Sequence, residues 1–178
     1  MNYATIKNCD IANGPGVRVS LFVSGCTHKC KGCFNEIAWD FDYGTPFTPE
    51  TEDSILAMLA PGYVTGITLL GGEPFEPQNQ PHLVQLLRRI KQQYPEKSIW
   101  AFSGYLFENM LAGKVGDREV CMQFLSMLDV LVDGPFVESK KNLMLRFRGS
   151  ENQRIIDVPA SLAQGEVVLW QDWQGERK

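Results

Sequence analysis

Short runs of apolar and β-branched residues alternate along the chain with longer segments that have helical spacing. The runs predicted to be strands are Val17–Val23, Val64–Leu70, Ser98–Phe102 and Val130–Val132. The second run, VTGITLL, is almost continuously apolar or β-branched, as expected for a strand that is buried on both faces. This alternation favours an α/β fold with a mostly parallel sheet built from βα units.

Two of the intervening segments have the pattern of amphipathic helices. Thr48 is a suitable N-cap for the first helix, and Pro49 suits its first position. The apolar face of that helix comprises Ile55, Leu56, Met58 and Leu59. The second helix is predicted from Pro81 to about Tyr94, with its apolar residues at helical spacing and its basic residues toward the C-terminal end.

Three of the predicted strands run into turns that combine glycine with polar residues. These turns are Gly71-Gly72, Ser103-Gly104 and Asp133-Gly134. Parallel βα proteins bind ligands beyond the carboxyl ends of their strands, so we expect the functional site at these turns. A complete eight-unit barrel needs about 200 residues or more. A chain of 178 residues is therefore expected to form a partial, open TIM-like βα barrel.

Composition and charge restrict the class of protein and its partners. A hydrophobic content of 44% in residues 1–178 suits a single globular domain without a linker. The net charge is −4 and no dense run of Lys or Arg occurs, so neither nucleic acid nor a membrane is expected as a partner. The sequence MNYATIKNCD lacks the apolar core of a signal peptide, and no apolar run approaches the roughly 18 to 20 residues of a membrane span. We expect a cytoplasmic protein.

The five cysteines are unevenly distributed along the chain. Three of them fall within eight residues, as Cys26, Cys30 and Cys33. An odd total with this clustering argues against a secretory disulfide framework and favours a metal site in a reducing compartment. Cys9 and Cys121 stand alone and are interpreted as small, partly buried residues.

The clustered cysteines form a C-x3-C-x2-C loop directly after the first predicted strand. Thiolates are the ligands of iron–sulfur clusters, normally four for each cluster, and close spacing lets one loop bind several irons. Three local thiolates leave one coordination position open to a substrate or cofactor. The pattern also leaves open a structural zinc site, whose fourth ligand would be His28, Cys9 or His82.

A second candidate motif, Gly71-Gly72-Glu73-Pro74, follows the strand VTGITLL. Adjacent glycines allow close approach of the backbone, and Glu73 offers an anion to an ammonium group. Alone, this sequence is also an ordinary turn. Joined to an upstream loop of three cysteines, it becomes specific.

Together, the cysteine loop and the GGEP turn resemble the radical-SAM superfamily. The resemblance implies that Cys26, Cys30 and Cys33 hold a [4Fe-4S] cluster, and that S-adenosylmethionine chelates the open iron. The superfamily commonly has an aromatic residue before the third cysteine, where this chain has Gly32; the ring of Phe34 is the expected replacement. The cofactor contacts that the resemblance implies are Gly32, Cys33, Phe34, Gly71, Gly72, Glu73, Ser103 and Asp133.

Further segments are similar to those of glycyl-radical-enzyme activases, over most of the chain. They are NGPGVR (13–18), SGCTHKCKGCFN (24–35), SGY (103–105), LVDGPF (131–136) and FRGSENQRIIDV (147–158). Asn13 stands where the commoner activase motif has Asp, as is typical of the branch that serves anaerobic ribonucleotide reductases. Some relatives carry Lys at the position of Pro135, so a basic contact to the cofactor carboxylate is either absent here or supplied by Arg146 or Arg148.

This closer resemblance implies a function and two partners. A one-electron donor such as flavodoxin or ferredoxin would reduce the cluster, S-adenosylmethionine would be cleaved, and a hydrogen atom would be taken from a glycine in the catalytic subunit of an anaerobic ribonucleotide reductase. A short chain suits this role, because a polypeptide substrate can complete the walls of a truncated barrel. One alternative is a radical-SAM enzyme for a small molecule, such as a 7-deazaguanine-forming synthase, against which FRGSENQR argues. The other is a noncatalytic metal-binding adaptor.

Overall fold

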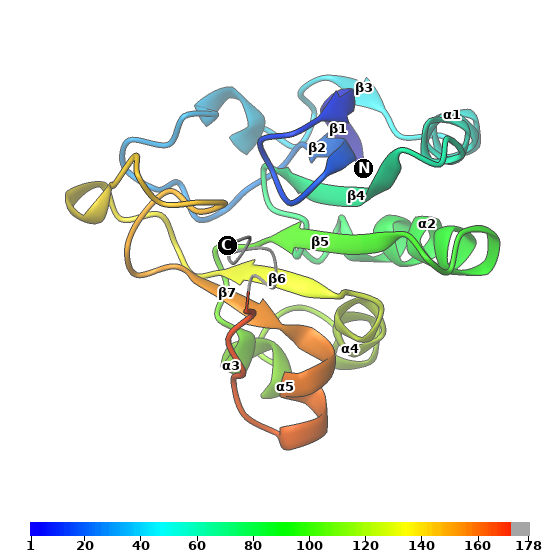
Figure 1. The fold of residues 1–178 in the computed structure, drawn as a ribbon. Helices are drawn as coiled ribbons and strands as arrows, with labels where there is room; N and C mark the ends of the chain where they lie inside the picture. Colours follow the sequence, from blue (N-terminus) through cyan, green and yellow to red (C-terminus); the bar gives the residue numbers. More distant parts are fainter. Residues whose placement is uncertain (172–178) are drawn as a thin grey trace.

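The computed structural model describes residues 1–171, which contain a sheet with the strand order β3-β1-β2-β4-β5-β6-β7. The four central strands pair in parallel and follow one another across the sheet in chain order (Figure 1). They are β2 (Val17–Val23), β4 (Val64–Gly71), β5 (Ser98–Phe102) and β6 (Val130–Asp133). The predicted α/β class and the four predicted strands are confirmed.

The outer strands of the sheet are antiparallel, and the hydrophobic pattern does not predict them. β1 (Asn2–Asp10) pairs with β2, and β3 (Thr45–Pro46) pairs with β1. β7 (Arg154–Asp157) pairs with β6. Every residue of β1 is at least partly exposed, so its sequence lacks the apolar alternation that marks a half-buried strand. β7 has only four residues, which is too short for a periodic pattern.

The two predicted helices connect the parallel strands. α1 (Pro49–Leu59) begins as expected, with the Thr48 hydroxyl accepting a hydrogen bond from the backbone N–H of Thr51. α2 (Gln80–Gln93) follows β4. Within residues 1–171, no helix has the length and apolarity needed to cross a membrane. The remaining helices are η1 (Glu36–Trp39), α3 (Phe107–Leu111), α4 (Arg118–Ser126), η2 (Glu138–Lys140) and α5 (Val158–Gln164).

The two faces of the sheet are filled differently. On one face, strand residues such as Val19, Ile67 and Leu131 pack with the buried sides of α1, α2 and α4 in the main core. The opposite face carries a smaller cluster around Trp100 and Val132. This second face also holds polar groups, and the functional site lies above it.

A fully buried arginine joins three parallel strands on the second face. Arg18 donates from Nε to the Thr68 hydroxyl at 2.7 Å and from Nη2 to the Ile67 carbonyl at 2.7 Å. Nη1 donates to the Ser98 hydroxyl at 2.9 Å, and the guanidinium lies 5.6 Å from the centre of the Trp100 ring. Burial lowers the pKa of Arg18 to about 10, so the side chain is still a cation at neutral pH. The NGPGVR segment is therefore built into the sheet through its arginine.

Candidate metal and cofactor site

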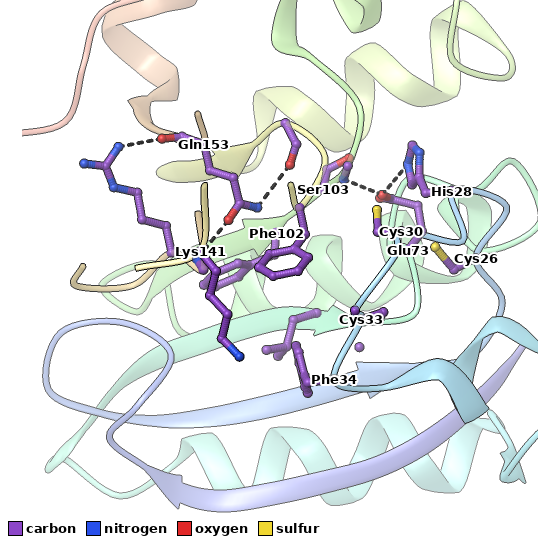
Figure 2. Close-up of a pocket in the computed structure, with 18 of the residues that line it drawn as sticks. Cys26, His28, Cys30, Cys33, Phe34, Glu73, Phe102, Ser103, Lys141 and Gln153 are labelled. Atoms are coloured by element: carbon purple, nitrogen blue, oxygen red, sulfur yellow. Dashed lines mark hydrogen bonds and ion pairs between the residues drawn. The ribbon is translucent and has the colours of Figure 1, made fainter. Parts of the chain in front are cut away.

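A cavity of about 550 Å³ lies at the carboxyl ends of the parallel strands, where the cysteine loop and the segment after β6 meet (Figure 2). It brings together residues that follow β2, β4 and β5. All the residues predicted to bind a cluster or cofactor line it, with the exception of Asp133. They are Cys26, Cys30, Gly32, Cys33, Phe34, Gly71, Gly72, Glu73 and Ser103.

Backbone hydrogen bonds join the cysteine loop to the Gly71-Gly72 turn. Val23 and Gly71 are register partners at the ends of β2 and β4. The Gly72 N–H donates to the Val23 carbonyl at 2.7 Å, and the Glu73 N–H donates to the Gly25 carbonyl at 2.8 Å. A Cβ on Gly72 would lie 2.5 Å from the Gly25 oxygen. Because Gly72 has no Cβ, the turn after β4 can pack closely against the backbone of the cysteine loop.

Glu73 is buried at the base of the cavity, with 1% of its surface exposed. Its Oε1 accepts the backbone N–H of Phe75 at 2.8 Å, and its Oε2 accepts that of Gly104 at 2.7 Å. The same Oε2 lies 3.0 Å from His28 Nε2 (Figure 2). Contacts from three segments therefore fix the position of this carboxylate.

His28 is a partly buried residue of the cysteine loop. Its ring packs edge-on against Tyr105, with 4.3 Å between the ring centres. Burial disfavours the charged form of His28, but bonding to Glu73 outweighs it and raises the pKa of His28 above its ordinary value. His28 thus links the cysteine loop to the turns after β4 and β5.

A second buried carboxylate from the same turn also holds the cysteine loop. Glu76 is 3% exposed, and its Oε1 accepts both the N–H of Thr27 at 2.7 Å and the Thr27 hydroxyl at 2.6 Å. The sequence interpretation missed this residue. Its one signal is a carboxylate three positions after Glu73 in the same turn.

The three thiols of the cysteine loop line one cavity without converging on a single ion position. Cys26, Cys30 and Cys33 are free thiols that line one cavity, yet in residues 1–171 no three His, Cys, Asp or Glu side chains converge on one ion position. Figure 2 shows Cys26 and Cys30 beside Glu73, and Cys33 farther along the loop. A [4Fe-4S] cluster binds its thiolates at different irons, so it does not need ligands that meet at one point. Burial raises the pKa of the Cys26 thiol to about 11, and iron binding would displace that proton.

The three candidates for a fourth zinc ligand contact other groups. His28 contacts Glu73, and His82 Nε2 lies 3.1 Å from the N-terminal nitrogen of Met1. Cys9 lies 3.9 Å from the Tyr63 hydroxyl. The described residues therefore do not assemble a four-ligand zinc site. Cys9 is also exposed, contrary to expectation, whereas Cys121 is buried as expected.

The rim of the cavity explains the unusual glycine before the third cysteine. Gly32 has a φ of +73°, a backbone conformation that residues with side chains rarely adopt, so an aromatic residue there would be strained. A Cβ there would also lie 2.9 Å from Oε1, at the end of the Glu138 side chain. The neighbouring Lys31 forms an ion pair with Glu138 at 3.2 Å. Phe34 lies at the rim with 86% of its surface exposed.

A hairpin formed by residues 137–151, here called the cavity hairpin, makes the opposite wall. A β-bridge joins Lys141 to Ser150 across it. Gln153 closes its base, where Oε1 accepts the Gly149 N–H at 2.8 Å and Nε2 donates to the Gly134 carbonyl at 3.0 Å. The FRGSENQR segment therefore shapes this wall.

The cavity hairpin brings two basic residues to the cavity. Arg148 lines the cavity and donates to the Gln153 carbonyl at 2.6 Å. Lys141, which the sequence interpretation did not select, also lines it, and Figure 2 shows its side chain at the cavity edge. Arg146 is not among the lining residues. Among residues 1–171, Lys141 and Arg148 are thus the two Lys or Arg side chains that line the cavity.

Asp133 is not among the described residues that line the cavity, and its predicted cofactor contact stays a prediction. The residue is fully buried, and Arg154 Nε donates to its Oδ1 at 2.9 Å while the Phe107 N–H donates to its Oδ2 at 2.8 Å. Arg154 also binds Glu108 at 2.7 Å. Asp133 therefore joins β6 to β7 and α3, and only its neighbour Gly134 reaches the cavity.

The fold and the thiol-lined cavity define an iron–sulfur protein of the α/β class, and residues 12–156 match the family described as 4Fe-4S single cluster domain. Similar proteins from Salmonella typhi and Escherichia coli (strain K12) are each 43% identical over 155 residues, covering 86% of this chain and 96% of the relative. One from Enterobacteria phage T4 is 41% identical over 157 residues, covering 87% and 93%. All three are named anaerobic ribonucleoside-triphosphate reductase-activating protein. The chain belongs to this family of activating proteins.

Proposed function

We propose that this protein cleaves S-adenosylmethionine reductively at a [4Fe-4S] cluster and generates a glycyl radical on an anaerobic ribonucleoside-triphosphate reductase. The observation that carries the proposal is the single cavity in which Cys26, Cys30 and Cys33 lie beside the buried carboxylate of Glu73. The names of the relatives support the identity of the partner.

The chemistry requires one electron and one hydrogen atom. When bound, the cluster would pass an electron from a donor such as flavodoxin or ferredoxin to S-adenosylmethionine, with methionine, 5′-deoxyadenosine and a glycyl radical on the partner as products. Cys26, Cys30 and Cys33 would hold three irons and leave the fourth for the cofactor. The walls of the cavity would fix the reacting groups and exclude water.

Glu73 is proposed to bind the ammonium group of the cofactor. Its two oxygens accept one backbone N–H each, Oε2 also contacts His28 Nε2, and a carboxylate has about four lone-pair positions. A charge-assisted hydrogen bond to an ammonium group therefore remains available. The other proposed contacts are made by Gly71, Gly72 and Ser103, with Gly32, Cys33 and Phe34 beside the adenine.

We also propose that residues 1–178 form one radical-SAM domain with an incomplete TIM-like barrel. The four parallel strands follow one another in chain order, with α1, α2 and α4 packed in the core on one face. This order of strands and helices supports the proposal of a barrel wall. Antiparallel strands flank the parallel set on both sides, which leaves the wall open.

The test is anaerobic reconstitution followed by reaction with the reductase catalytic subunit. We expect iron and inorganic sulfide for one cluster, production of 5′-deoxyadenosine, and a glycyl doublet in electron paramagnetic resonance. Replacing the radical-site glycine of the partner by alanine should remove the doublet. Cofactor cleavage without that signal, together with consumption of a purine precursor, would favour the small-molecule alternative. Bound zinc without sulfide would favour the adaptor.

A further inference from the structure

Two of the most exposed large apolar side chains line the cavity, and two more are sequence neighbours of lining residues. In the part of the chain that the structure describes, four are more exposed than all others: Ile11 at 74%, Phe34 at 86%, Leu143 at 87% and Met144 at 89%. Phe34 and Leu143 line the cavity, and the other two directly adjoin lining residues. We call these four residues the apolar rim.

The cavity hairpin carries Leu143 and Met144, two of the four residues of the apolar rim. Hydrogen bonds and ring packing fix its conformation. The Glu151 N–H donates to the Lys140 carbonyl at 2.9 Å, and the Val137 N–H donates to the Ser150 hydroxyl at 3.2 Å. The ring of Phe147 packs edge-on against Trp100 at 5.5 Å between centres. The hairpin therefore presents its exposed tip at a defined place beside the cavity mouth.

The charge of the cavity hairpin differs in sign from that of the whole chain, whose net charge is −4. Glu138 is paired with Lys31, and Glu151 accepts a hydrogen bond from Asn142 at 3.0 Å. Among residues 1–171, no ion-pair partner is found for Lys140 or Lys141. The hairpin carries two carboxylates and four cations: Glu138, Glu151, Lys140, Lys141, Arg146 and Arg148.

We infer that the apolar rim and the hairpin cations form the docking surface for the segment of the reductase catalytic subunit that carries the radical-site glycine. This inference rests on the proposed function. An exposed apolar patch bordered by polar groups is typical of a protein interface, and basic side chains favour a partner with acidic flanks. Through Phe34 and Leu143, the patch borders a concavity with thiols inside, which an inserted polypeptide can enter and a flat lipid surface cannot. The docking segment should thus be apolar near its tip and acidic beside it.

The experiment measures glycyl-radical yield against the concentration of the catalytic subunit. Met144→Glu should raise the half-saturating concentration at least about tenfold, since it replaces an apolar contact by a charge that repels acidic flanks. Lys140→Glu should raise it by a smaller factor that shrinks at high salt. Met144→Leu and Tyr63→Glu should behave like the wild type, since Tyr63 is 61% exposed at the start of β4, at the opposite end of the sheet. All four variants should cleave S-adenosylmethionine at the wild-type rate without the partner.

Failure of the inference is distinguishable from failure of the proposed function. If the wild type forms the glycyl radical and Met144→Glu leaves the half-saturating concentration unchanged, the docking surface is wrong and the function stands. If the wild type cleaves the cofactor but forms no radical on the partner, the proposed function fails. Two further measurements test other occupants of the apolar rim. Sedimentation of the protein alone reports self-association, and sedimentation with phosphatidylserine vesicles reports membrane binding. Loss of self-association or of vesicle binding in Met144→Glu, with unchanged half-saturation, would assign the rim to a second copy or to a membrane and overturn the inference.

Discussion

The cysteine loop and the cavity hairpin face one cavity but are attached to the protein in different ways. The cysteine loop is bonded through its backbone to the Gly72-Glu73 turn, and two buried carboxylates, Glu73 and Glu76, hold its side chains. The hairpin is held mainly by its own hydrogen bonds and by the packing of one ring on Trp100, and its tip is exposed. The cysteine loop thus forms a fixed wall of the cavity, as expected for a cofactor-binding site. The hairpin has the surface of a protein interface.

Removing a thiol from the fixed wall should have the largest effect. Cys30→Ala should reduce S-adenosylmethionine cleavage to background, because two remaining thiolates leave the cluster short of a ligand. The measurement is 5′-deoxyadenosine formation after anaerobic reconstitution, with iron and sulfide content. Cys9→Ala and Cys121→Ala are the controls and should retain cleavage. Full activity in Cys30→Ala would disprove the assignment of the cluster ligands.

Breaking the base of the hairpin wall should affect stability more than cofactor binding. Arg154→Ala leaves the fully buried Asp133 without its cation, which should lower the free energy of unfolding by about 3 to 5 kcal/mol. Chemical denaturation checks this value. Glu108→Gln is the control, since it removes only the exposed partner of Arg154 and should cost under about 1 kcal/mol. Equal losses in the two variants would contradict the structural role of Asp133.

Neutralising Glu73 tests the fixed wall more finely. Glu73→Gln keeps the shape and one acceptor oxygen but removes the charge, so cofactor binding should weaken by about 1.5 to 3 kcal/mol. Calorimetry on cluster-loaded protein measures this change. Glu76→Gln is the matched control, because Glu76 holds the same loop but does not line the cavity. Similar affinities for both variants and the wild type would reduce the GGEP segment to a structural turn.

The smallest expected effect is a pH dependence of stability at the hairpin base. Hydrogen bonding to Arg154 lowers the pKa of Glu108 to about 2. A lowered pKa means that this contribution is complete above the ordinary glutamate pKa of about 4.5 and is lost as the pH falls toward 2. Glu108 is 56% exposed, so solvent screening keeps the contribution below about 1 kcal/mol. Unfolding measured at pH 5 and pH 3 should show a larger loss for the wild type than for Glu108→Gln.

The parallel half of the fold was predictable because its pattern is local. The run VTGITLL and the cap at Thr48 contain their own structural signals. β1 escaped prediction because it lies second from the sheet edge, beside the two-residue strand β3, with every residue at least partly exposed. Arg18 escaped because a charged residue is expected at the surface, and its partners Thr68 and Ser98 are about 50 and 80 positions away along the chain.

The same distinction applies to the site. The cysteines and Glu73 were predictable because motif spacing identifies them, whereas Lys141 reaches the cavity only through the pairing of the hairpin. The partners of Asp133 were not predictable, because a residue at the end of a strand can point to either side of the turn. Its neighbour Gly134 faces the cavity while Asp133 binds Arg154. Such choices depend on tertiary contacts that a linear pattern does not contain.

The attachment of the cysteine loop has a consequence for the lifetime of the enzyme in air. The backbone bonds of Gly25, Gly72 and Glu73 and the contacts of Thr27 and His28 involve no metal. Loss of an oxygen-damaged cluster should therefore leave the chain folded, with its thiols still lining the cavity. We expect that rebuilding the cluster after oxygen exposure requires only reducing equivalents, iron and sulfide. The same polypeptide could then receive a new cluster repeatedly without being resynthesised.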